Sequence, residues 1–126
     1  MPISILIVDG QAHVRQALKR KLSLAEEISV IGEAQSAEEV IIKVMSLKPD
    51  VVLMDLNLSP KNGVELTKEL IEKTPEVNVL LMATTDDQRR ISKIIKAGAL
   101  GYILKDVNAV ILQEAIMAVA HGDAYI

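Results

Sequence analysis

Short apolar runs alternate with amphipathic segments along the whole chain. The runs are rich in Val, Ile and Leu, which is typical of strands buried in a parallel sheet. We predict strands at 3–9, 28–34, 51–55, 77–83 and 101–105. Apolar residues recur at helical spacing between them, and we predict helices at 12–25, 36–47, 62–74, 87–97 and 108–121. This alternation predicts an α/β fold, a doubly wound five-stranded parallel sheet of order 2-1-3-4-5 with helices on both faces.

Two of the predicted helices have clear end signals. Ser36 and Glu39 have the spacing of a capping box at the start of the second helix. Pro49 should end that helix. Gly122 is the expected stop of the last helix.

Composition narrows the classes of protein that are possible. The chain has 126 residues, of which 50% are hydrophobic, and this is enough for the core of one domain. It has no cysteine, which suits a reducing cytoplasm, and no apolar run near the roughly 20 residues that span a bilayer. A net charge of −3 and only two aromatic residues argue against nucleic-acid binding by this segment itself.

Charged residues stand where three of the predicted strands end. Asp9 ends the first strand, Asp55 the third and Lys105 the fifth. The carboxyl ends of parallel strands form the functional crevice of such folds, so we expect these residues to converge. Paired carboxylates suit Mg²⁺, and a carboxylate can also attack phosphorus to give an aspartyl phosphate. The alternative is that both aspartates only cap loops and helices.

The segments 5–9, 48–57, 62–63 and 97–106 together resemble the receiver domains of bacterial two-component response regulators, in particular the LuxR/NarL type. The likeness runs from Ile3 to about Tyr125. It implies the flavodoxin-like form of the fold. It also implies that residues 1–126 are a receiver domain forming the N-terminal part of a longer regulator.

The resemblance implies a role for each residue of the crevice. Asp55 would be the phosphoacceptor, Lys105 the phosphate-contacting lysine and Tyr102 the aromatic switch. Asp9, Asp55 and the backbone carbonyl of Asn57 would hold Mg²⁺. Such a domain is a cytoplasmic signalling module, and its only catalysis is its own aspartyl phosphorylation.

The resemblance also implies partners. A sensor histidine kinase would donate the phosphoryl group, and nucleic acid would be bound only by an output domain outside this segment. A basic band formed by Arg89, Arg90, Lys93 and Lys96 lies on the fourth predicted helix, where family members signal or dimerise. A homodimer is therefore possible, and the alternative is a solvated helix face.

Two positions depart from the family pattern. Gly10 stands where the second acidic residue is usual, and a glycine has no side-chain oxygen for a metal. Ala83 stands where a hydroxyl is usual, and Thr84 could replace it only if the strand end shifts by one residue. Losing even a residue that only supports a metal ligand lowers metal affinity or activity roughly 10- to 100-fold. We therefore expect weak Mg²⁺ binding and slow phosphorylation.

Two other functions compete with a working receiver. A degenerate pseudo-receiver would keep the fold and act as a phosphorylation-independent interaction module, which Gly10 and Ala83 favour. A flavodoxin-like cofactor binder would need a phosphate-cradling loop after the first strand. The sequence at 10–13 has neither the glycine spacing nor the hydroxyls for such a loop.

Overall fold

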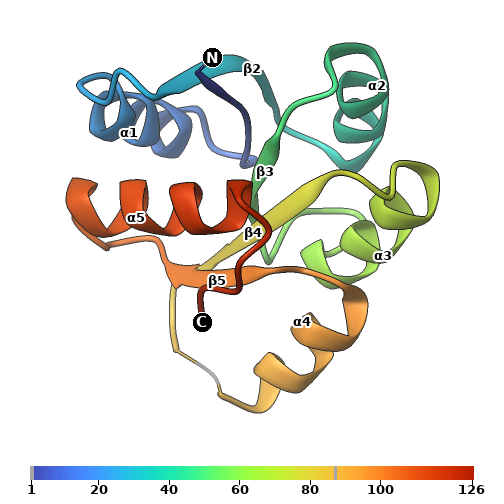
Figure 1. The fold of residues 1–126 in the computed structure, drawn as a ribbon. Helices are drawn as coiled ribbons and strands as arrows, with labels where there is room; N and C mark the ends of the chain where they lie inside the picture. The colour runs from blue at the N-terminus through green and yellow to red at the C-terminus, as the bar shows by residue number, and fades with distance from the viewer. Residues whose placement is uncertain (1, 87) are drawn as a thin grey trace.

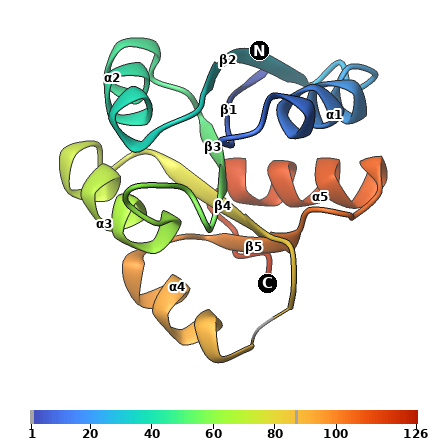
Figure 2. The ribbon, with the colours of Figure 1, turned by 180° about the vertical axis from the view of Figure 1, so that it is seen from behind.

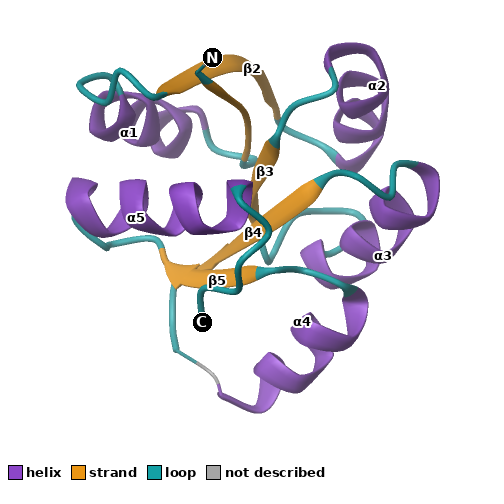
Figure 3. Ribbon diagram, viewed as in Figure 1, coloured by secondary structure: helices purple, strands orange, loops and turns teal. Residues whose placement is uncertain are grey.

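The computed structural model of the chain describes residues 2–86 and 88–126. Each strand is followed by a helix, and the helices and strands are distinguished by colour in Figure 3. The strands are β1 (Ile3–Val8), β2 (Ile28–Ala34), β3 (Val51–Asp55), β4 (Asn78–Ala83) and β5 (Gly101–Leu104). The helices are α1 (Ala12–Leu22), α2 (Ala37–Leu47), α3 (Gly63–Lys73), α4 (Ile91–Ala97) and α5 (Ala109–Ala120), and a 3₁₀ turn, η1 (Gln88–Arg90), precedes α4.

The strands form one parallel sheet in the order β2-β1-β3-β4-β5, which confirms the predicted topology. Helices α1 and α5 lie on one face, and α2, α3 and α4 lie on the other (Figures 1 and 2). Because β1 and β3 are neighbours, the residues that follow them share one edge of the sheet. The strand order reverses between β1 and β3, because β2 lies on one side of β1 and the later strands lie on the other. In open α/β sheets the functional crevice lies at such a point.

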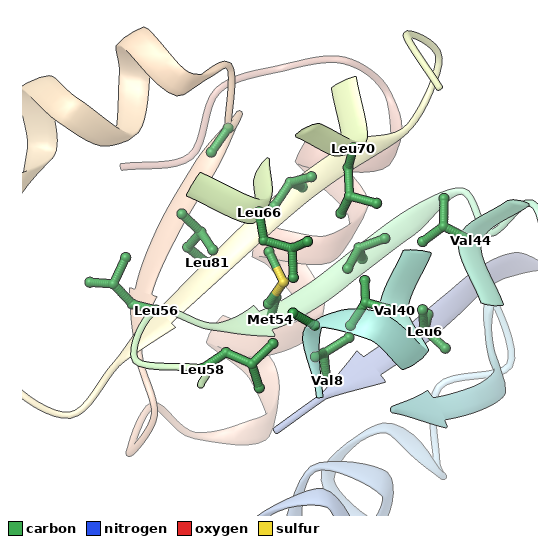
Figure 4. Packing of buried hydrophobic residues seen from close by; sticks show 14 of the residues in the cluster. Leu6, Val8, Val40, Val44, Met54, Leu56, Leu58, Leu66, Leu70 and Leu81 are labelled. Atoms are coloured by element: carbon green, nitrogen blue, oxygen red, sulfur yellow. The ribbon is translucent and has the colours of Figure 1, made fainter. Parts of the chain in front are cut away.

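Each face of the sheet has its own hydrophobic core. On the face of α2, α3 and α4, the buried side chains gather around Met54 of β3, as Figure 4 shows. On the other face, Leu18 and Leu22 of α1 pack with Leu112 and Ile116 of α5. Strands β1, β3, β4 and β5 are largely buried on both faces, which explains why their sequences read as continuous apolar runs, whereas the edge strand β2 is partly exposed.

Helix ends differ from the predictions in two places. The helix predicted at 12–25 ends at Leu22, and Ala25 instead turns back into the core with 8% exposure. The helix predicted at 87–97 begins as the 3₁₀ turn η1 and becomes α-helical only at Ile91, and residue 87 lies outside the described residues.

A capping box has two hydrogen bonds, and the one predicted at the Ser36 side chain is confirmed. Ser36 accepts from the Glu39 backbone N–H at 3.3 Å, but the Glu39 carboxylate accepts from Gln35, one residue earlier than expected. The C-cap of α2 is Lys48, in the left-handed conformation directly before Pro49. Gly122 has φ 86°, two residues beyond the end of α5. The predicted stops are therefore where these helices end.

Gly63 places the start of α3 against the end of β3. A Cβ at this position would lie 2.9 Å from Leu56 Cα and 3.0 Å from the Asp55 carbonyl oxygen. Both are backbone atoms, which cannot move aside as the end of a flexible side chain can. The close approach of helix to strand, and with it the position of Asp55, therefore requires glycine.

Candidate functional site

The three charged residues predicted to converge do so at the carboxyl edge of the sheet. The Lys105 ammonium lies 2.7 Å from Asp9 Oδ2 and 3.3 Å from Asp55 Oδ2. Asp9 follows β1, Asp55 is the last residue of β3, and Lys105 follows β5. One ammonium between two carboxylates leaves one negative charge uncompensated, which favours a further cation at this edge.

Hydrogen bonds hold both carboxylates in place. Asp9, only 1% exposed, accepts from the Gln11 backbone N–H at 2.9 Å through Oδ1. Asp55 Oδ1 accepts from the Asn57 backbone N–H at 3.0 Å. Each aspartate therefore bonds the N–H two residues further along, as an Asx turn does. Such turns are expected from the alternative in which both aspartates only cap loops and helices. That alternative does not explain why both carboxylates also contact Lys105.

The environment keeps Lys105 charged. Burial alone would lower the pKa of the lysine, but the hydrogen bond to Asp9 and the attraction of Asp55 outweigh it, so the pKa lies above its ordinary value. The Lys105 backbone N–H donates to the Ala83 carbonyl at 2.9 Å, which anchors the residue to the end of β4. The lysine therefore supplies a fixed positive charge at the site.

A cavity of about 320 Å³ opens over these charges. Its lining includes Thr84, which is exposed just beyond the end of β4, whereas Ala83 is buried in the core with 2% exposure. The register of β4 with β3 and with β5 runs without a shift. The strand-end shift that we considered for Thr84 therefore does not occur, and Thr84 reaches the cavity from the following loop.

The donor set suits Mg²⁺ but is small. Asp9, Asp55 and Asn57 all line the cavity, and two carboxylates with a carbonyl are within the range of ligands that Mg²⁺ accepts. Gly10 also lines it and offers no side-chain oxygen. Within residues 2–86 and 88–126, no three Asp, Glu, His or Cys side chains are grouped to hold a metal. The residues present therefore fit a weakly bound Mg²⁺ that keeps several water ligands.

Tyr102 of β5 points into the core. Its ring is buried at 7% exposure among the core residues of the α2–α4 face. Its hydroxyl donates to the Thr85 carbonyl at 3.1 Å, and Thr85 lies in the loop between β4 and α4. The residue predicted as a switch therefore ties that loop to β5.

Two contacts at the site were not predicted. Arg90 Nη1 donates to the Asn57 side-chain oxygen at 3.3 Å, which links η1 to the loop after β3. Arg15 Nη1 donates to the Asp9 carbonyl at 2.7 Å. Helical spacing indicates neither contact, because it does not reveal which atom a long side chain reaches.

Comparison with known proteins agrees with this geometry. The response regulator receiver domain family matches residues 5–117. The transcriptional regulatory protein DegU of Brevibacillus brevis is 40% identical over 124 residues, which are 98% of this chain and 52% of DegU. LnrK of Bacillus subtilis is 41% identical over 120 residues, 95% of this chain and 54% of LnrK. The chain thus spans about half the length of these curated relatives.

Solved structures share the fold closely. A LuxR-family two-component response regulator from Aurantimonas sp. SI85-9A1 superposes with a TM-score of 0.94 at 27% identity, covering 100% of this chain and 90% of that one. The receiver domain of RcsB from Salmonella enterica, solved with the phosphomimetic BeF₃⁻, has a TM-score of 0.88 at 19% identity over 100% and 94% of the two chains. Within the described part of the chain, no helix has the length and apolar character needed to cross a membrane. The chain belongs to the response regulator receiver domain family, among the signalling receivers of LuxR-type two-component regulators.

Proposed function

We propose that this domain accepts a phosphoryl group on Asp55 from a sensor histidine kinase. The observation that carries the proposal is the Lys105 ammonium, which lies 3.3 Å from the Asp55 carboxylate and is also held by Asp9. An Asp55 oxygen would form a bond to phosphorus while the phosphorus–nitrogen bond of a phosphohistidine breaks and the histidine nitrogen keeps the electron pair. Lys105 would then offset the charge of the phosphoryl oxygens.

Asp9, Asp55 and the Asn57 carbonyl would hold Mg²⁺. When bound, this ion would neutralise charge on the phosphoryl oxygens during transfer. The exposed Thr84, on the cavity lining, would offer the hydroxyl that Ala83 lacks. With one carboxylate fewer than the family pattern, metal binding and phosphorylation would both be weak rather than absent.

The signal would pass to a transcriptional output domain. Supporting this, the relatives DegU and LnrK are transcriptional regulatory proteins about twice as long as the matched region. Residues 1–126 would then be the N-terminal receiver of a longer cytoplasmic regulator. A homodimer, formed through the basic band of η1 and α4, would be the assembly that carries the signal.

A degenerate pseudo-receiver is the second candidate function. Gly10 and Ala83 favour it, because each removes a group that would support the transferred phosphoryl group. The Asp9, Asp55 and Lys105 cluster argues against it, since a domain that only binds partners has no need of a buried carboxylate pair around one ammonium.

Intact mass after incubation with a small phosphodonor and Mg²⁺ separates the two candidates. We expect the wild type to gain one phosphoryl group slowly and Asp55→Asn to gain none. The Lys105→Met variant should also be strongly impaired, because it keeps the acceptor but loses the cation. A wild type that stays unmodified at high donor concentration, while Gly10→Asp is modified, would establish the pseudo-receiver.

A further inference from the structure

Arg15 of α1 makes two contacts with one guanidinium group. Its Nη1 donates to the Asp9 carbonyl at 2.7 Å, and its Nε donates to Glu33 Oε1 at 2.9 Å. The Arg15 side chain is only 14% exposed. It therefore joins three elements: α1, the end of β1 at the site, and the edge strand β2.

We propose that Arg15 is a positioning residue that sets the affinity of the site for a divalent cation by fixing the backbone of Asp9. This inference rests on the proposed function, in which Asp9 is a ligand of that cation. Arg15 would act through Asp9 without touching the metal. Partners of this kind, which hold a ligand in place, commonly change metal affinity roughly 10- to 100-fold when they are lost.

The Asp9 backbone needs such a contact because of its neighbour. Gly10 has no side chain, and the nearest atom to the position of a Cβ there is the Gln35 carbonyl oxygen, 3.9 Å away. Residue 10 is exposed, so packing around it does little to hold the peptide group that it shares with Asp9. The bond from Arg15 to the Asp9 carbonyl therefore holds the peptide group between Asp9 and Gly10.

The other polar atoms of Asp9 already have hydrogen-bond partners. Its N–H donates to the Ala34 carbonyl at 3.1 Å, and its carboxylate accepts from Gln11 and Lys105. With Arg15 on the carbonyl, every polar atom of this buried residue is bonded. Removing Arg15 would leave the Asp9 carbonyl without its partner next to the exposed position 10, and the peptide would turn to find another.

Glu33 is the anchor that orients the guanidinium. A hydrogen bond from Lys19 lowers the pKa of Glu33, burial opposes this, and Arg15 lowers the pKa further, so the carboxylate stays ionised. The planar guanidinium presents its two donors at a fixed angle, one toward Glu33 and one toward Asp9. A lysine at position 15 would keep the charge without this fork.

Magnesium titration and amide hydrogen exchange test the proposal together. Mg²⁺ binding is measured by calorimetry in the Gly10→Asp background, where the added carboxylate makes binding measurable. Exchange of the Asp9 and Gln11 amides, which donate to the Ala34 carbonyl and to Asp9 Oδ1, is measured without metal in the natural sequence. The variants are Arg15→Ala, Arg15→Lys and Glu33→Gln, and Lys19→Ala is the matched control, because Lys19 bonds Glu33 but not Asp9.

We expect Arg15→Ala to weaken Mg²⁺ binding roughly 10- to 100-fold and to speed exchange at both amides. Arg15→Lys should not restore either quantity, and Glu33→Gln should have a smaller effect in the same direction. Lys19→Ala should leave both unchanged. If Arg15→Ala is too unstable to measure, Glu33→Gln and Arg15→Lys, which change fewer contacts, decide the question.

The proposal is overturned if the Arg15 variants bind Mg²⁺ as the Gly10→Asp parent does, or if Lys19→Ala weakens binding equally. The latter result would mean that only the general stability of α1 matters. Failure of the proposed function is a separate result, seen as a natural sequence that takes up no phosphate. If the natural sequence takes up no phosphate, the amide exchange rates and the Mg²⁺ titration in the Gly10→Asp background still test the role of Arg15.

Discussion

The Lys105 ammonium donates to Asp9 Oδ2 at 2.7 Å, although the two residues are 96 positions apart in the sequence. Lys105 follows β5 and Asp9 follows β1, so the lysine side chain reaches past the ends of β4 and β3, and Asp55 is the last residue of β3. A phosphoryl group on Asp55 would compete with Asp9 for this lysine. The charges of Asp9, Asp55 and Lys105 are therefore the first feature of the site to test by substitution.

Replacing Lys105 with methionine should reduce the free energy of unfolding at pH 7 by about 1–3 kcal/mol, because buried Asp9 loses its cation. The pKa of Lys105 is raised in the folded state, so its stabilising contribution is fully present below the unfolded pKa. That contribution should disappear as the pH rises through the folded pKa, above the ordinary range for lysine. Urea unfolding of both proteins at neutral and strongly alkaline pH measures the difference, and a constant difference would contradict it.

Gly63→Ala should destabilise the domain and disturb the phosphoacceptor. The new Cβ would lie 3.0 Å from the Asp55 carbonyl oxygen and 2.9 Å from Leu56 Cα, and overpacking of this kind costs about 1–3 kcal/mol. Gly10→Ala is the control, since the nearest atom to its Cβ is 3.9 Å away. Chemical denaturation should show a loss for Gly63→Ala and little change for Gly10→Ala, and equal losses would refute the steric explanation.

Tyr102→Phe should loosen the loop between β4 and α4 without unfolding the core. The variant keeps the buried ring but loses the bond to the Thr85 carbonyl, which is worth about 0.5–1.5 kcal/mol. Tyr125→Phe is the control, because the hydroxyl of Tyr125 has no hydrogen bond to any residue that the structure describes. Increased backbone motion at Thr85, measured by nuclear spin relaxation, should follow only the first change.

Sedimentation tests whether the basic band of α4 is a dimer contact. Lys93 and Lys96 are exposed, as are the acidic residues Asp106 and Glu114 near β5 and α5. If copies associate through these charges, Lys93→Glu with Lys96→Glu should dissociate the dimer, and added salt should do the same. Lys68→Glu on α3 serves as the control. A wild type that is monomeric at every concentration would leave the band as a solvated face.

Strand positions could be predicted because burial on both faces produces apolar runs. The predicted ends at Asp9, Asp55 and Lys105 are each within one residue of the observed strand ends. The end of α1 could not be predicted, because Ala25 packs into the core from a turn and keeps the apolar pattern going. The η1 turn was missed for a similar reason, since its spacing resembles that of an α-helix over one turn.

The convergence of charges at the site followed from topology, but their finer contacts did not. Parallel strands bring Asp9 and Asp55 to one edge whatever the loops do. By contrast, the bond from Arg15 to the Asp9 carbonyl depends on one rotamer of a long side chain, as does the bond from Arg90 to Asn57. Sequence periodicity carries no information about such rotamers. Nor does periodicity show that Thr84 reaches the cavity from the loop after β4 while the register of β4 stays unshifted.

The dependence of the initial phosphorylation rate on Mg²⁺ tests most directly the claim that Asp55 works in a site short of one metal ligand. The rate is followed by intact mass with a small phosphodonor, for the wild type, Gly10→Asp and Ala83→Thr, with Asp55→Asn as the blank. Position 10 has room for a side chain, so the added carboxylate should not disturb the fold. Ala83→Thr should mainly prolong the phosphorylated state, because the hydroxyl would contact the phosphoryl group after transfer.

We predict that Gly10→Asp reaches its half-maximal rate at a Mg²⁺ concentration roughly 10- to 100-fold lower than the wild type does. We also predict that Asp55→Asn gains no phosphate at any concentration. Equal half-saturation of the wild type and Gly10→Asp would contradict the claim, because another oxygen would then already supply the missing ligand.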